Sequence, residues 1–156
     1  MKTYNIISID EFKTNIENNS RLLGIDPGNR NIGFAICDEN KKVATPLVVL
    51  QKSKFGVLIK KINQIIKENH IKGIIIGNPL NMDGTSGKSS QSANDFAKNL
   101  SKNITIPIAM WDERLSSEAS FKITKELGTN VTNRVNKLDM NAATFILQGA
   151  LDYFNN

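Results

Sequence analysis

The 156-residue sequence contains one cysteine, Cys37, and one histidine, His70. A single cysteine excludes an internal disulfide and a cysteine-cluster metal site, and it agrees with a reducing compartment. We interpret Cys37 as a core residue of a strand and His70 as a surface turn residue after a helix. Neither residue is assigned any chemistry.

Long apolar runs are also missing. No run approaches the roughly 20 residues that span a bilayer, and the N-terminus lacks the apolar centre of a signal peptide. We therefore expect a cytoplasmic protein without membrane contact. The composition, 40% hydrophobic and 22% charged, is ordinary for a soluble chain. The length fits one domain, and there are no repeats or low-complexity tracts.

The first 20 residues differ from the remainder and are predicted to form an extension to a domain over residues 21–156. Ser8 and Glu11 have the spacing of a capping box, and Ile9, Phe12 and Ile16 form one helical stripe. These features predict a short helix that docks on the main domain.

Negative charge is the minority: 20 Lys and Arg against 15 Asp and Glu give a net charge of +5 and a pI near 9.4. An excess of Lys and Arg favours an anionic partner, because such side chains neutralise phosphates and release counterions. Many basic proteins bind no nucleic acid, so charge alone raises this expectation only modestly.

The hydrophobic pattern predicts an α/β domain. Three strands over 22–25, 32–37 and 43–50 form an antiparallel meander, and Pro46 favours an edge position for the third. Helices over 55–66 and 93–100 then alternate with strands over 74–76 and 104–111. Further helices are expected from Ser116 to Gly128 and from Leu138 to Tyr153, separated by a flexible basic loop over 128–137. We expect a mixed five-stranded sheet, with two parallel strands after the meander and helices on both faces.

Three acidic positions stand out beside apolar segments. Asp26 ends the first strand at a Pro-Gly turn, Glu113 follows the last strand directly after Asp112, and Asp139 lies in the first turn of the closing helix. Sites in α/β proteins form at the carboxyl ends of parallel strands. We therefore expect Asp26 and Glu113 to lie at the ends of neighbouring strands, with Asp139 facing them.

Carboxylates gathered in this way repel one another unless a cation neutralises them, and oxygen ligands suit Mg²⁺ or Mn²⁺. Two such ions can activate water and stabilise the leaving oxygen in phosphodiester cleavage. Each acid also has a structural interpretation: Asp26 as a turn residue, Glu113 as a partner of Arg114, and Asp139 as an anion at a helix N-terminus.

Four motifs together resemble the YqgF/RuvX family, over about residues 21–154. They are Ile25-Asp-Pro-Gly28 with Ile32-Gly-Phe-Ala35, Gly77-Asn-Pro-Leu-Asn-Met-Asp-Gly-Thr85, Asp112-Glu-Arg-Leu-Ser-Ser117 with Glu118-Ala119, and Leu138-Asp-Met-Asn-Ala-Ala143 with Ile146-Leu-Gln148.

The resemblance implies an RNase H-like fold and a small metal-dependent nuclease, described as a pre-16S rRNA nuclease and, earlier, as a Holliday junction resolvase. Asp26, Glu113 and Asp139 correspond to its acidic positions and would hold one or two Mg²⁺ or Mn²⁺ ions. The loop from Gly77 to Gly84 would flank the cleft. Candidate phosphate contacts are Arg30, Asn81, Arg114, Arg134 and Lys137. The sequence departs from the family pattern at Pro27, Asn29, Asn78 and Trp111.

Several functions remain open. The first is an endonuclease that processes the 5′ end of pre-16S rRNA in ribosome biogenesis. A resolvase acting on branched DNA would use the same chemistry but would normally need a dimer, whereas we expect a monomer or weak dimer. A phosphate-binding fold of the sugar-kinase and actin type is disfavoured, because the chain has one glycine hairpin and no second copy. A non-catalytic binder of nucleic acid or of ribosome-assembly partners is the last alternative.

Overall fold

The computed structural model describes residues 5–81, 83–115 and 131–156, and for 131–141 the backbone alone. The strands are β1 (Ile6–Ile7), β2 (Arg21–Pro27), β3 (Asn31–Cys37), β4 (Ala44–Gln51), β5 (Ile71–Asn78) and β6 (Ile108–Asp112). The helices are α1 (Ile9–Asn15), α2 (Phe55–Asn69), α3 (Lys88–Ser101), the short 3₁₀ turn η1 (Glu113–Leu115) and α5 (Val131–Phe154).

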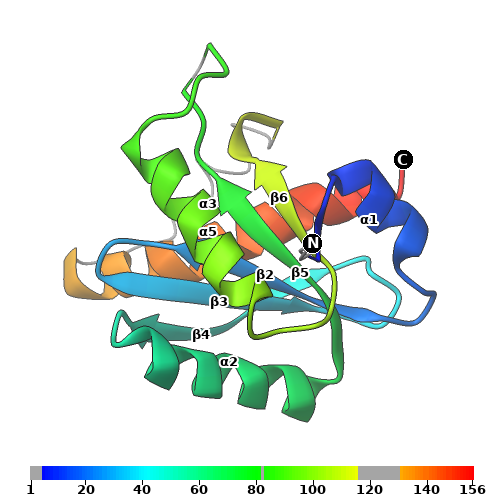
Figure 1. The fold of residues 1–156 in the computed structure, drawn as a ribbon, viewed down its shortest axis with the longest axis horizontal. Coiled ribbons are helices and arrows are strands. Elements are labelled where there is room, and N and C mark those ends of the chain that lie inside the picture. Colours follow the sequence, from blue (N-terminus) through cyan, green and yellow to red (C-terminus); the bar gives the residue numbers. More distant parts are fainter. Residues whose placement is uncertain (1–4, 82, 116–130) are drawn as a thin grey trace.

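One mixed sheet organises the chain, with strand order β1-β6-β5-β2-β3-β4 (Figure 1). The meander β2-β3-β4 is antiparallel, whereas β1, β6, β5 and β2 run parallel to one another. The predicted RNase H-like class is confirmed. As predicted, β4 lies at an edge of the sheet, so no further strand needs the backbone N–H that Pro46 lacks. The sheet has six strands rather than five, because Ile6 and Ile7 pair with Ile108 and Ala109.

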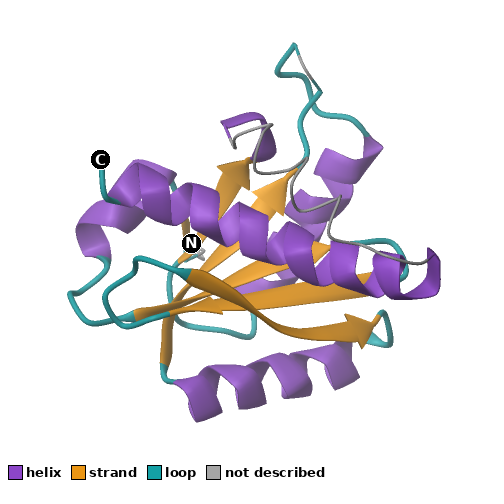
Figure 2. Ribbon diagram, turned by 180° about the vertical axis from the view of Figure 1, so that it is seen from behind, coloured by secondary structure: helices purple, strands orange, loops and turns teal. Residues whose placement is uncertain are grey.

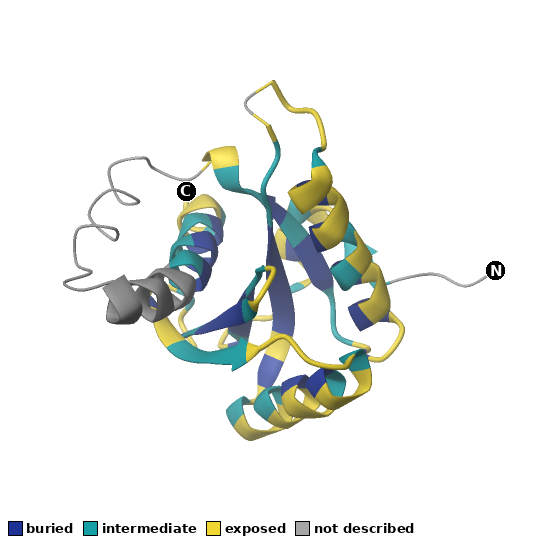
Figure 3. Cartoon of the chain, turned by 90° about the vertical axis from the view of Figure 1, so that its left-hand side faces the viewer, coloured by how far each residue is buried: buried dark blue, intermediate teal, exposed yellow. Residues whose placement is uncertain are grey.

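The two faces of the sheet carry different helices. The long helix α5 crosses one face, as Figure 2 shows, and buries Ala143, Ile146 and Leu147 in a core cluster that also contains Phe12 of α1. The other cluster joins Leu58 and Ile62 of α2 to the strands and to α3. Burial is greatest on the strands and on the helix sides turned toward them (Figure 3). The core therefore consists of two layers, one on each side of the sheet.

Several element boundaries differ from the prediction: α2 and β5 are longer than expected, and α3 begins at Lys88 instead of residue 93. The last strand begins at Ile108 and not at Ile104. The carbonyls of Ile104 and Ile106 accept hydrogen bonds from the side-chain amide of Asn5 rather than from a neighbouring strand. The prediction of a loop over 128–137 is wrong from residue 131 onward, because α5 already begins at Val131. Val131, Val135 and Leu138 have the i, i+4, i+7 spacing that continues the apolar row of α5.

The helix predicted from Ser116 lies outside the described residues. Among the helices that are described, none has the length and apolar character required to cross a membrane.

Candidate active site

The carboxyl ends of β2, β5 and β6 meet at one edge of the sheet. Asp26 is the next-to-last residue of β2, and Glu113 opens η1 immediately after β6. These two strands are not neighbours as expected, because β5 lies between them. Their parallel direction still brings the two acids to the same edge.

Gly77 of β5 makes room between the two acids. A β-carbon at Gly77 would lie 2.4 Å from Cδ1 of Ile146 and 3.5 Å from Cδ of Glu113. The Glu113 side chain therefore occupies space beside β5 that a larger residue would fill. A cleft of about 210 Å³ opens here, lined by Asp26, Pro27, Gly28, Asn29, Gly77, Pro79, Ser89, Ser92 and Glu113.

The acids in the cleft affect each other electrostatically. The pKa of the Glu113 carboxyl is raised to about 7, first by burial and then by the negative charges of Asp26 and Asp112. No hydrogen bond or ion pair from another described residue compensates the Glu113 carboxylate. Burial and the neighbouring negative charges therefore both disfavour the ionised form of Glu113.

Two proline-centred turns shape the cleft. The amide of Gly28 donates to the carbonyl of Asp26 at 3.0 Å, and the amide of Leu80 donates to that of Asn78 at 3.0 Å. Each turn spans three residues around a proline, whose fixed φ suits such a turn. Pro27 thus ends β2 in a tight turn, and Gly28 and Asn29 after it line the same cleft as Asp26. Gly28 is required, because a β-carbon there would lie 2.4 Å from the carbonyl oxygen of Asn31.

Arg114 pairs with Asp112 and not with Glu113. Its Nη2 lies 2.7 Å from Oδ2 of Asp112, and its Nε donates to the same carboxylate. This contact lowers the pKa of Asp112. The guanidinium also approaches Gly84, whose positive φ of 88° and missing β-carbon permit the close contact. Arg114 therefore connects the end of β6 to the loop before α3.

Of the other predicted phosphate contacts, Arg30 lies next to the cleft and Asn81 bonds within its own loop. Arg30 is exposed in a neighbouring hollow of about 570 Å³ that Lys52 and Asn29 also line, so it lies next to the cleft. Asn81 uses its side chain inside the loop, where Nδ2 donates to Oγ1 of Thr85 at 3.0 Å. The side chains of Asp139, Arg134 and Lys137 lie outside the described residues, and their roles stay predictions.

Ser89 and Ser92 are cleft residues that the sequence analysis missed. Both lie in the first turns of α3, whose N-cap Gly87 provides no side-chain hydrogen bond to the free amides. The only sequence signal for them is a pair of serines at the start of a helix that follows a turn-rich loop. This pattern is too common to indicate a binding site by itself.

Two departures from the family pattern have structural roles. Trp111 is buried and packs edge-on against Tyr153 of α5, with ring centroids 5.8 Å apart. Oδ1 of Asn78 accepts a hydrogen bond from Ser90 at 2.6 Å and so fastens β5 to α3. Asn29 contributes to the cleft wall instead.

The family model described as RuvX, Holliday junction resolvase, matches residues 20–153. The chain belongs to the RuvX family. A relative from Pelagibacter ubique is 48% identical over 97% of this chain and 100% of its own length, and one from Ruegeria pomeroyi is 40% identical over 96% and 97%. Both are named "Putative pre-16S rRNA nuclease".

Solved structures support the fold assignment. The T. thermophilus RuvC structure in complex with Holliday junction substrate superposes with a TM-score of 0.50. The match covers 86% of this chain and 94% of that one at 12% identity. At this identity the similarity shows a shared fold of the RNase H-like class.

The donor set suits a hard divalent cation. Asp26 and Glu113 offer only oxygen ligands. A cation beside Glu113 would offset the burial and the negative charges that raise the pKa of its carboxyl. Among the side chains that the structure describes, no three acids, histidines or cysteines form a metal-binding group. A third ligand has to come from elsewhere in the chain or from water.

Proposed function

We propose that this chain is a metal-dependent endonuclease that processes the 5′ end of pre-16S rRNA. The observation that carries the proposal is the shared cleft of Asp26 and Glu113, in which burial and the negative charge of Asp26 raise the pKa of the Glu113 carboxyl. The names of the relatives that match nearly the whole chain support the substrate.

Asp139 is the proposed third ligand. It precedes Ala143 by one helical turn in α5, and the Ala143 carbonyl lies 3.1 Å from the position of a Gly24 β-carbon. Gly24 precedes Asp26 by two residues in β2, on the same face of the sheet. This placement brings the first part of α5 toward the acidic edge.

Asp26, Glu113 and Asp139 would hold one or two Mg²⁺ or Mn²⁺ ions. Bound there, such ions supply an activated water and stabilise charge on the leaving oxygen of a phosphodiester. Because the pKa of the Glu113 carboxyl is raised to about 7 without an ion, binding of a cation near neutral pH would displace a proton from it.

The remaining cleft residues would bind the nucleic-acid backbone. The hydroxyls of Ser89 and Ser92 and the uncapped amides at the start of α3 can donate to a phosphate, which the helix dipole also favours. Arg30 and Lys52 extend the positive surface past the β2–β3 turn. Arg134 and Lys137 are proposed contacts from the side of α5.

Cleavage of branched DNA is the second candidate function, and the family description and the RuvC complex favour it. Both candidates use the same acids, so the site does not discriminate between them. Resolution of a two-fold symmetric junction requires two active sites and hence a dimer. The oligomeric state in solution therefore bears directly on this alternative.

A side-by-side cleavage assay tests both functions. Precursor rRNA fragments and a four-way DNA junction are incubated with Mn²⁺ and the wild type, Asp26→Asn, Glu113→Gln or Asp139→Asn. We expect the wild type to cleave the RNA and the three variants to lose at least about 100-fold in rate, as for loss of a principal catalytic group. Asp95→Asn, on the exposed face of α3, is the matched control that keeps activity.

The outcomes separate the functions. Cleavage of the junction alone would favour the resolvase. Cleavage of neither substrate by a folded wild type would overturn the nuclease and favour a role in binding nucleic acid or ribosome-assembly partners.

A further inference from the structure

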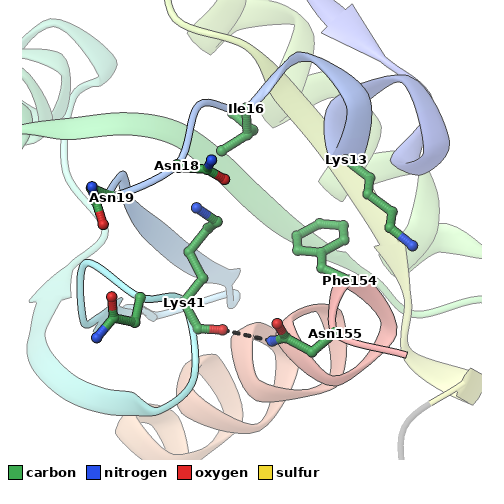
Figure 4. A pocket seen from close by; sticks show the side chains of 8 residues that line it. Lys13, Ile16, Asn18, Asn19, Lys41, Phe154 and Asn155 are labelled. Atoms are coloured by element: carbon green, nitrogen blue, oxygen red, sulfur yellow. Dashed lines mark hydrogen bonds between the residues drawn. The ribbon is translucent and has the colours of Figure 1, made fainter.

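A second cavity lies at the opposite end of the sheet from Asp26. It has a volume of about 530 Å³ and is bordered by α1 and the loop after it, by the β3–β4 turn and by the end of α5. Figure 4 shows Lys41 extending into it between Asn18, Asn19 and Phe154. The cavity borders the segment before β2, whereas Asp26 lies near the end of that strand. Seven strand residues at about 3.3 Å each separate the two sites by about 20 Å.

The lining is positive and rich in free amides. Lys41 contributes its ammonium group, and no acidic side chain lines the cavity. Lys13 also lines it, with its exposed side chain holding the ammonium 5.9 Å from the centroid of the Tyr153 ring. The side-chain amides of Asn18, Asn19 and Asn40 are exposed and form no hydrogen bond with another described residue. Each amide offers two donors and an acceptor. Such a surface suits an anionic ligand that also carries a planar ring with hydrogen-bond donors and acceptors along its edge.

One wall of the cavity is apolar and rigid. It consists of Ile16 and Phe154. The Phe154 ring stacks on Phe12 with centroids 5.7 Å apart and also contacts Tyr153 edge-on. The ring is therefore held in place before any ligand arrives, which lowers the entropic cost of binding.

Lys41 has an unusual backbone. Its φ is +55°, a conformation that lysine rarely adopts. Nδ2 of Asn155 donates to its carbonyl at 2.8 Å, and its own Nζ donates to the carbonyl of Glu17 at 2.9 Å. An ammonium group has three donors, so two remain to contact a ligand. The ends of the chain thus position Lys41 over the cavity.

We propose that this cavity binds one nucleotide of a single-stranded RNA segment. Lys13 and Lys41 contact the phosphate, the free amides read the edge of the base, and the base ring lies against Ile16 and Phe154. A single strand is required, because A-form duplexes hide base edges from such a pocket. The exposed position of the amides lets the strand continue on both sides. The inference rests on RNA as the substrate class of the proposed function, but not on cleavage.

Most residues that line the cavity lie outside the part of the chain that the family model matches. The family model matches residues 20–153, and of the lining residues only Asn40 and Lys41 fall inside that range. The others come from the N-terminal extension, from the last residue of α5, Phe154, and from Asn155 after it. The site therefore gives the extension a role in holding RNA at a distance from the acids.

Fluorescence anisotropy tests the inference with labelled single-stranded RNA, in EDTA so that no cleavage occurs. The variant is Lys13→Gln with Lys41→Asn, because asparagine tolerates the positive φ of position 41. The control is Lys60→Gln with Lys61→Gln, which removes the same charge from the exposed side of α2. Thermal unfolding of both proteins checks that they remain folded.

We expect the cavity variant to bind about tenfold more weakly. Its plot of log Kobs against log salt should be shallower by about 0.7, since the cavity neutralises one phosphate and each phosphate contact on a single strand contributes about 0.7. The control should keep the affinity and slope of the wild type. Equal losses in both variants, or no loss in either, would overturn the proposal.

Two further arms distinguish the ligand source and the two sites. We expect AMP to displace the labelled RNA from the wild type, because the cavity takes a single nucleotide. AMP that binds without displacing the RNA would assign the cavity to free nucleotides and overturn the RNA proposal. Asp26→Asn should lose cleavage and keep this RNA binding. The cavity variant should still cleave a substrate too short to reach the cavity, so the failure of one proposal leaves the other standing.

Discussion

Asp26 helps to raise the pKa of Glu113, although the two residues belong to segments that β5 separates. Gly77, in the intervening strand, leaves room for the Glu113 side chain, since a β-carbon there would lie 3.5 Å from its Cδ. The raised pKa of Glu113 beside Asp26 has consequences for stability and for metal binding.

Stability without metal should depend on pH through Glu113. Its pKa is about 7 in the folded state against an ordinary value of 4.5, so the folded state binds more protons between these values. The free energy of unfolding should therefore fall as pH rises from about 4.5 to 7, by roughly 1–3 kcal/mol once solvent screening is allowed for. Urea denaturation in EDTA at several pH values measures this. Glu113→Gln should flatten the dependence, and an unchanged slope would contradict the assignment.

Divalent cations should stabilise the fold. A cation at a concentration 100 times its Kd adds about 2.7 kcal/mol, and a chain of this size gains about 2–4 °C in Tm per kcal/mol. We expect Mn²⁺ to raise the Tm of the wild type by several degrees. Asp26→Asn should abolish the shift, whereas Asp95→Asn should retain it. An equal shift in all three proteins would mean that the ion binds elsewhere.

Gly24→Ala should disturb the packing of α5 on β2. A β-carbon at Gly24 would lie 2.7 Å from Cβ of Leu147 and 3.1 Å from the carbonyl oxygen of Ala143. Because a backbone atom is involved, the helix has to shift, at a cost of about 1–3 kcal/mol. Since α5 carries Asp139, cation binding should weaken as well.

Gly56→Ala is the matched control for this substitution. Nothing lies within 4 Å of a β-carbon at Gly56 in α2, so alanine should raise the unfolding free energy by about 0.5–1 kcal/mol. Chemical denaturation and a Mn²⁺ titration measure both variants. A neutral Gly24→Ala would show that α5 does not pack as tightly as described.

Ser8→Ala should weaken the N-terminal helix α1. The Ser8 hydroxyl accepts a hydrogen bond from the Glu11 amide at 3.1 Å and caps the helix. Loss of such a cap costs about 1 kcal/mol. Limited proteolysis of the N-terminal segment should accelerate, and Ser8→Asp, which retains a capping oxygen, should restore resistance. RNA affinity should fall together with the order of α1, since the helix contributes Lys13 to the second cavity.

The elements with a clear hydrophobic period were predicted well. Helix α2 has apolar residues at helical spacing, and β5 is a short run of isoleucines, so local pattern alone identified both. The start of α5 was missed because its first two turns are polar apart from Val131 and Val135. The strand β1 was missed because two isoleucines become a strand only when β6 is present to pair with them.

The sequence by itself determined the fold class, the cap of α1, the edge position of β4 and the acids that end strands, because each depends on residues close in the chain. Tertiary structure alone decided that β5 separates Asp26 from Glu113 and that Ser89 and Ser92 reach the cleft. It also decided that the two ends of the chain enclose a second cavity with Lys41. The physical reason is the same in each case: these relations depend on strand order and helix packing, which bring together residues that no local period connects.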